Sequence, residues 1–127
     1  MKGNMNEPNE NSGVVLDVEA ISKELRIRPE IYLKIVSSFT ATLGDKMKKL
    51  GDAVETNNIE QMRVILHEIK GTAGNLRLRS ICEPEEVMHV AVKEGATQEK
   101  LRQYFLVLKA ETEKVQKHVA AITQQKS

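Results

Sequence analysis

The stretch of sequence best suited to chemistry is residues 66–71, which read Leu-His-Glu-Ile-Lys-Gly. The imidazole of His67 is a good nucleophile near neutral pH. Arg63 precedes it by four residues and Lys70 follows it by three, so on a helix both cations would lie beside the ring. Cations repel a metal ion, but they can neutralise the oxygens of a phosphoryl group carried on the imidazole. The pattern therefore favours phosphoryl chemistry at His67 over metal binding.

A helix through this stretch must point His67 away from the core. At about 100° per residue, the histidine lies about 140° from the centre of the apolar stripe. Gly71 and Gly74 share its exposed face, and their missing side chains clear the surface for a partner protein. Alternatively, Gly71 is a C-cap that ends the helix at Lys70. The stripe consists of Ile59, Met62, Ile65, Leu66, Ile69, Ala73 and Leu76.

The rest of the chain also has helical spacing. Helices are expected over about 17–26, 29–54, 59–76, 80–94 and 98–123, with Asp17, Asn58 and Thr97 as N-caps and Pro29 in a first turn. Two points stay open. Gly44 and Gly51 weaken the second helix, which could break or bend near Gly44-Asp45. Pro84 either begins the fourth helix or follows an irregular turn.

Composition limits the class of protein. The chain has 127 residues, the length of one domain, and only 3 prolines and 7 glycines, too few turn signals for a many-stranded sheet. Four long amphipathic segments with short links favour an all-α, up-down four-helix bundle, with the short N-terminal helix closing one end. Residues 1–13 are expected to be a disordered polar lead-in, and residues 14–127 the domain.

Charge and cysteine content exclude several functions. The 19 basic and 18 acidic residues give a net charge of +1, which argues against nucleic-acid binding. Cys82 is the single cysteine, so no internal disulfide can form, as in a reducing compartment. No apolar run has the roughly 20 residues of a membrane span. We therefore expect a cytoplasmic monomer without a membrane segment.

Other polar residues have ordinary explanations at this stage. His89 and His118 are isolated, without a second ligand at metal-binding spacing, and are expected at the surface. Glu83, Glu85 and Glu86 are interpreted as a solvated helix start. We therefore expect no metal site.

Residues 67–74, His-Glu-Ile-Lys-Gly-Thr-Ala-Gly, resemble the core motif of histidine-containing phosphotransfer (HPt) domains, the relay modules of two-component signalling. The helical layout from about residue 16 to residue 122 is similar to that family's four-helix bundle. The resemblance implies that His67 accepts a phosphoryl group on its distal ring nitrogen. It also implies that Lys70 assists and that Gly71 allows a receiver domain to approach closely.

The resemblance also implies partners. These are response-regulator receiver domains and a hybrid sensor histidine kinase, with Mg²⁺ supplied by the receiver and no cofactor of the chain's own. No Gly-rich phosphate cradle is present, so we expect a phosphoryl carrier without kinase activity. The docking surface is expected to include Glu60, Arg63, Val64 and Gly74, flanked by the exposed face of the preceding helix. Arg77 and Arg79 would complete a basic rim around His67 that attracts a receiver's acidic site.

Two departures and two alternatives remain. Arg77 stands where the family usually has glycine, so the helix end must be built differently, through Gly74-Asn75. Glu85, Met88 and His89 stand where it usually has a small residue and a Leu-Glu pair. Residues 67–70 also resemble the H-box of a histidine-kinase dimerisation helix, but the usual proline is missing. A non-catalytic helical adaptor, with His67 incidental, is the alternative from a different class.

Overall fold

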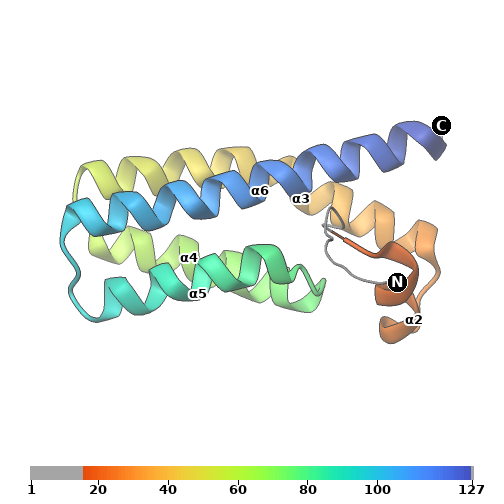
Figure 1. Ribbon diagram of the computed structural model, residues 1–127, viewed down its shortest axis with the longest axis horizontal. Helices are drawn as coiled ribbons and strands as arrows, with labels where there is room; N and C mark the ends of the chain where they lie inside the picture. Colours follow the sequence, from red (N-terminus) through yellow and green to blue (C-terminus); the bar gives the residue numbers. More distant parts are fainter. Residues whose placement is uncertain (1–15, 127) are drawn as a thin grey trace, which may run out of the picture.

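The computed structural model describes residues 16–126, with side chains over 16–124. This part of the chain has five helices and no strands, which confirms the predicted all-helical class. The polar lead-in predicted over 1–13 lies outside the described residues. The helices are α2 (Val18–Leu25), α3 (Pro29–Glu55), α4 (Ile59–Asn75), α5 (Arg79–Lys93) and α6 (Gln98–Lys126) (Figure 1).

The four longer helices pack side by side in the cyclic order α3, α4, α5, α6, and α2 packs against α3. Helices α3 and α6 have 27 and 29 residues, against 17 in α4 and 15 in α5. Both therefore extend beyond α4 and α5 at the end where α2 lies (Figure 1). The predicted stripes meet between the helices: Leu43, Leu50, Leu66, Leu101 and Leu108 are fully buried. Burial of each such side chain contributes about 1.5–3 kcal/mol.

Side chains cap the helices where the sequence predicts them. Asp17 Oδ1 accepts the Ala20 N–H at 3.0 Å at the start of α2. Asn58 Oδ1 accepts the Gln61 N–H at 3.1 Å at the start of α4. Thr97 Oγ1 accepts the Lys100 N–H before α6, and Pro29 is the first residue of α3. Each side-chain cap satisfies one backbone donor that the helix leaves unpaired.

The end of α4 depends on Arg77, in the left-handed conformation at φ 60°. The next N–H, from Leu78, donates to the Ala73 carbonyl at 2.9 Å, which closes a Schellman motif. A non-glycine residue costs roughly 1–2 kcal/mol there. The guanidinium donates to the Gly74 carbonyl at 3.0 Å and to Glu24 at 2.8 Å. Arg77 thus takes the backbone conformation that favours glycine, at the position where the HPt family usually has glycine. Hydrogen bonds from its own side chain hold it there.

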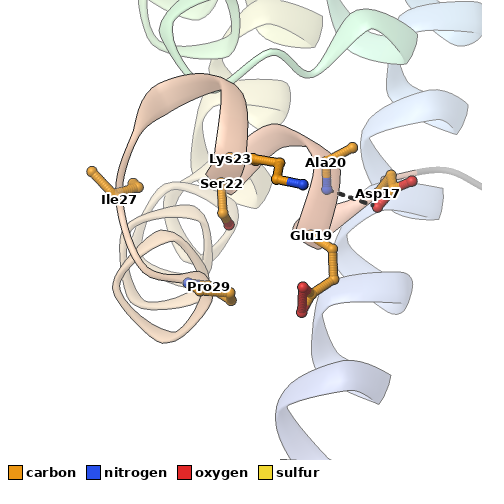
Figure 2. A pocket seen from close by; sticks show the side chains of 7 residues that line it. All are labelled: Asp17, Glu19, Ala20, Ser22, Lys23, Ile27 and Pro29. Carbon is orange, nitrogen blue, oxygen red and sulfur yellow. Dashed lines mark hydrogen bonds between the residues drawn. The ribbon is translucent and has the colours of Figure 1, made fainter.

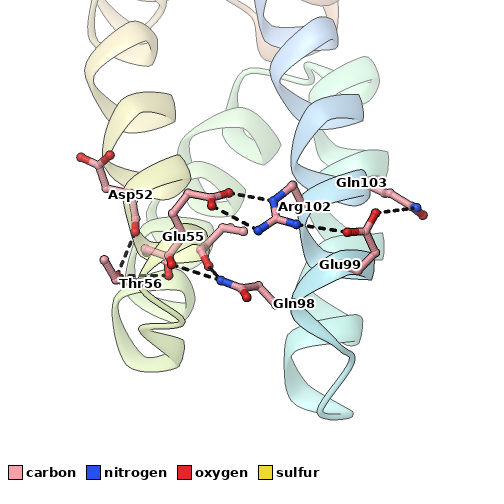
Figure 3. A network of polar contacts seen from close by, with 9 residues as sticks. Asp52, Glu55, Thr56, Gln98, Glu99, Arg102 and Gln103 are labelled. Atoms are coloured by element: carbon pink, nitrogen blue, oxygen red, sulfur yellow. Dashed lines mark hydrogen bonds and ion pairs between the residues drawn. The ribbon is translucent and has the colours of Figure 1, made fainter.

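Two contacts hold the ends of neighbouring helices together. The buried Tyr32 hydroxyl of α3 donates to the Leu76 carbonyl at 2.6 Å, just beyond α4, and burial raises the pKa of Tyr32 to about 12. At the opposite end of α3, Gln98 of α6 donates to the Val54 carbonyl at 2.8 Å (Figure 3). The Tyr32 hydroxyl gives a partner to a carbonyl at the end of a helix. The Gln98 amide is a further donor to the Val54 carbonyl, which also accepts the Asn57 N–H at 3.1 Å.

Arg102 of α6 forms a bidentate pair with Glu55 at the end of α3, at 2.8 and 3.1 Å (Figure 3). Its remaining nitrogen donates to Glu99 at 3.1 Å. The hydrogen bond from Arg102 holds the pKa of Glu55 below its usual range. The bidentate geometry of this pair orients the end of α3 relative to α6.

Helix α5 differs from both alternatives left open by the sequence. It begins at Arg79, five residues before Pro84, and continues through the proline to Lys93. Pro84 lacks the N–H that would donate to the Ser80 carbonyl, so one bond of the first turns is missing. The packing of α5 against α4 and α6 outweighs this local penalty.

Helix α3 is unbroken through Gly44 and Gly51, so the break considered near Gly44-Asp45 is absent. The two glycines have different surroundings. A Cβ at Gly51 would lie 3.0 Å from Cζ of Phe105 on α6, whereas a Cβ at Gly44 would meet nothing within 4 Å. Gly51 therefore allows a close approach of α6, and Gly44 has no such role.

This difference gives a matched pair of substitutions on one helix. Gly44→Ala should raise the free energy of unfolding by about 0.5–1 kcal/mol, because alanine is the better helix former and has room. Gly51→Ala should raise the free energy of unfolding by less than this, or lower it, because the Phe105 ring must move. Urea unfolding of both variants measures which of the two is more stable. A Gly51→Ala variant at least as stable as Gly44→Ala would contradict the proposed contact.

Candidate functional site

The packing of α4 determines where His67 points. Met62, Leu66, Ile69 and Ala73 are fully buried, and α4 contacts α3 on one side and α5 on the other. His67 lies on the remaining, outward face and is exposed. The structure therefore confirms that His67 is exposed, as the apolar stripe predicts.

Gly71 and Gly74 contribute no side chains to the outward face of α4 beyond His67. Helix α4 continues to Asn75, so the alternative in which Gly71 ends the helix is wrong. A Cβ added at Gly71 or at Gly74 would meet nothing within 4 Å. Neither glycine is required by packing against another helix. Their effect is to keep the surface beyond His67 low.

Charged residues flank the histidine on both sides. Lys70 Nζ lies 3.7 Å from Glu86 Oε1 on α5, and both side chains are more than half exposed. On the side of α3, Glu68 pairs with Lys46 at 3.2 Å. Arg63, one turn before His67, is exposed and has no ion pair within residues 16–124. Arg63 and Lys70 are the two cations beside His67 on α4. Of these, only Lys70 forms an ion pair with a neighbouring helix.

The His67 ring itself is not held by a neighbour. Among the side chains and backbone groups described, none hydrogen-bonds to it. Neither ring nitrogen is thus committed to a partner within this part of the chain. An uncommitted imidazole on an outward face can act as a nucleophile toward a group that another molecule brings.

The predicted docking residues share the outer side of α4. Glu60, Arg63 and Val64 are exposed, Val64 at 44%, and Gly74 is half-buried. The outer face of the preceding helix is predicted as a flank of this surface, without named residues. The structure identifies the residues there: a shallow hollow of about 510 Å³ between α3 and α4, with the exposed side chain of Ile35 at its edge. It is lined by Lys34, Ile35, Ser38, Phe39, Thr42 and Thr72.

The basic rim around His67 is not assembled as predicted. Arg77 lies ten residues after the histidine, about 15 Å along the chain direction at the rise of a helix. Its guanidinium is bound to Glu24 and to the end of α4. Arg77 and Arg79 together line a different hollow, beside α2 and the start of α5. The positive charge beside His67 on α4 comes from Arg63 and Lys70, and an effect of Arg77 or Arg79 on a partner stays a prediction.

The acidic helix start is also different from the prediction. Glu85 is 1% exposed and its Oε2 lies 3.0 Å from Nδ1 of the half-buried His89, one turn later. Burial raises the pKa of Glu85, and the hydrogen bond from His89 opposes this shift. The charge of Glu86 raises that pKa further, whereas the charge of Lys70 lowers it. Glu85 is thus buried and paired with the half-buried His89, and of the three glutamates only Glu83 and Glu86 are solvated.

Other hollows lie away from the histidine. One of them, of about 530 Å³, is lined by residues of α2 and of the turn into α3, including Ser22, Lys23 and Pro29 (Figure 2). Within the described residues, no group of three or more His, Cys, Asp and Glu side chains could hold a metal ion. None of the described helices has the length and apolar character that crossing a membrane requires.

Comparisons of the chain with family models, with curated proteins and with solved structures find no match. The interpretation of the site therefore depends on its own residues and their geometry.

The buried Glu85 gives a pH prediction. Its pKa is higher in the folded than in the unfolded chain, where a glutamate has its ordinary value of 4.5. Protonated Glu85 therefore favours folding below that value, and this contribution is lost as the pH rises through the raised pKa. Relative to wild type, Glu85→Gln should gain stability as the pH rises from 4.5 through the raised pKa of Glu85. Urea unfolding across this range measures the difference, and parallel curves for the two proteins would contradict it.

Proposed function

We propose that the protein is a histidine phosphotransfer protein of a two-component phosphorelay. It would accept a phosphoryl group on His67 from a receiver-domain aspartate and pass it to another receiver. The observation that carries this proposal is the outward face of α4, where an uncommitted imidazole stands between Arg63 and Lys70. Gly71 and Gly74 leave the adjoining surface open to a second protein.

The proposed transfer is a displacement at phosphorus. The unprotonated ring nitrogen of neutral His67 attacks the aspartyl phosphate, and a bond forms between nitrogen and phosphorus. The bond between phosphorus and the aspartyl oxygen breaks, and the aspartate leaves as a carboxylate. The other ring nitrogen keeps its proton, so the phosphorylated ring is a cation and no proton is lost. The reverse sequence returns the group to a receiver.

The residues around His67 have separate parts in this proposal. Lys70, with Arg63, would neutralise the phosphoryl oxygens, and Gly71 would allow the receiver's backbone to come close. The acidic site and Mg²⁺ that stabilise transfer would belong to the receiver, and a hybrid sensor kinase would supply the phosphoryl group. The chain would carry the group without kinase activity of its own.

The helix packing supports a finer architecture as part of the same proposal. We infer an up-down four-helix bundle built from α3 to α6, closed at one end by α2. Its supports are the cyclic order of contacts and the position of α2 on α3 beside the overhanging ends (Figure 1). We propose that it acts as a cytoplasmic monomer, since its reacting group faces outward and needs no second copy.

A transfer assay tests the proposed function. The full chain is mixed with a panel of phosphorylated receiver domains, and acid-labile, base-stable label on the chain is measured. We expect label on wild type and none on His67→Gln, because glutamine has no ring nucleophile. The variant should remain folded, since His67 is exposed and makes no contact that packing requires. Equal label on both proteins would show that another residue accepts the group and would contradict the role of His67. No label on either protein would favour the helical adaptor in which His67 is incidental.

The clearance at Gly71 gives a second test. Gly71→Leu should lower the transfer rate from a receiver by at least about tenfold, since roughly 1.4 kcal/mol of interference at the interface is enough. It should affect loading by phosphoramidate far less, because that donor is small. Helix content by circular dichroism controls for folding, and leucine is a better helix former than glycine. Equal loss with both donors would contradict a role in partner approach.

A further inference from the structure

The cation that would bind the phosphoryl group is already paired in the free protein. Lys70 Nζ lies 3.7 Å from Glu86 Oε1, across the junction between α4 and α5. On a helix, residues three apart are neighbours, about 5–6 Å between Cβ atoms, so Lys70 can also reach a group carried on His67. A phosphoryl group on His67 and the Glu86 carboxylate would therefore compete for the same ammonium.

The contact with Glu86 is weak enough to be exchanged. Both side chains are more than half exposed, at 56% and 57%, and 3.7 Å is a loose separation for an ion pair. Exposed pairs of this kind contribute little to stability. A phosphoryl group carries more negative charge than a carboxylate and offers three acceptor oxygens. It should therefore take Lys70 from Glu86.

A second observation places Lys70 within the electrostatic reach of α5. Behind the ion pair lies the buried Glu85, whose carboxyl is affected by the charges of both Glu86 and Lys70. Lys70 thus has two acidic groups of α5 within electrostatic reach, whereas Arg63 has no ion pair among the described residues. Because only Lys70 pairs with α5, residues of α5 can affect how readily Lys70 binds a phosphoryl group on His67.

We propose that Glu86 is a positioning residue for Lys70. It holds the ammonium on the α5 side while His67 is free and releases it to a phosphoryl group on His67. The charge of Glu86 then sets how readily His67 is loaded and how long the phosphoryl group persists. This inference rests on the proposed function of His67 and adds a residue of α5 to it.

Phosphoramidate is the probe, since it phosphorylates histidine without a partner protein. The ring nitrogen forms a bond to phosphorus, the bond from phosphorus to nitrogen in the reagent breaks, and ammonia leaves. Loading rates and the half-life of the loaded form are measured for the full chain by ³¹P NMR. Glu86→Gln should increase both by about two- to fivefold, the range that an exposed ion pair supports. The increase should shrink at high salt, and Glu86→Asp should restore part of the wild-type behaviour.

A double-mutant cycle separates positioning from simple charge repulsion. In a Lys70→Met background, Glu86→Gln should change the loading rate little, because there is no ammonium to release. Glu83→Gln is the matched control: it removes the same charge from an exposed position of α5 that has no ion pair among the described residues. It should leave the rate near that of wild type.

The outcomes distinguish the two proposals. Label on wild-type His67 with unchanged rates in Glu86→Gln would overturn the role of Glu86 and leave the proposed function standing. An equal gain in the presence and absence of Lys70 would also overturn it, as the effect would then be repulsion of the donor. Absence of label on wild-type His67 would overturn both.

Discussion

The burial of one apolar stripe on α4 is the constraint on which the site depends. Met62, Leu66 and Ile69 are fully buried, so the helix cannot rotate without exposing them. Their burial contributes several kcal/mol, at about 1.5–3 kcal/mol for each large side chain. The direction of His67 is a consequence of this packing. The imidazole of His67 is thereby directed outward by residues that serve only to pack the helix.

The neighbours of α4 give the outward face its chemical character. Helix α3 supplies Lys46 to Glu68, and α5 supplies Glu86 to Lys70, so each flank of His67 has an ion pair that joins two helices. Exposed pairs of this kind add little to folding. They do determine which of the charged groups near His67 are already paired. The site is thus better described as a surface bordered by two ion pairs than as a pocket.

The features predicted correctly from the sequence are local ones. The caps at Asp17 and Asn58 need only residues three positions apart, and the exposure of His67 follows from the period of the helix. Features that need the packing of distant elements were missed. Nothing near Glu85 in the sequence indicates that α5 turns this carboxylate inward, and the proline before it suggested a helix start instead. Arg77 was assigned to the histidine, although its partner Glu24 lies 53 residues earlier in the chain.

Identifying which ring nitrogen carries the phosphoryl group tests the central claim most directly. The chain, with ¹⁵N-labelled histidine, is loaded from a phosphorylated receiver, and the ring nitrogens of its three histidines are observed by NMR. We expect coupling to phosphorus at Nε2 of His67 alone, with the His89 and His118 rings unphosphorylated. Phosphorus coupling at His89 or His118, or at none of the three in a folded protein, would contradict the account.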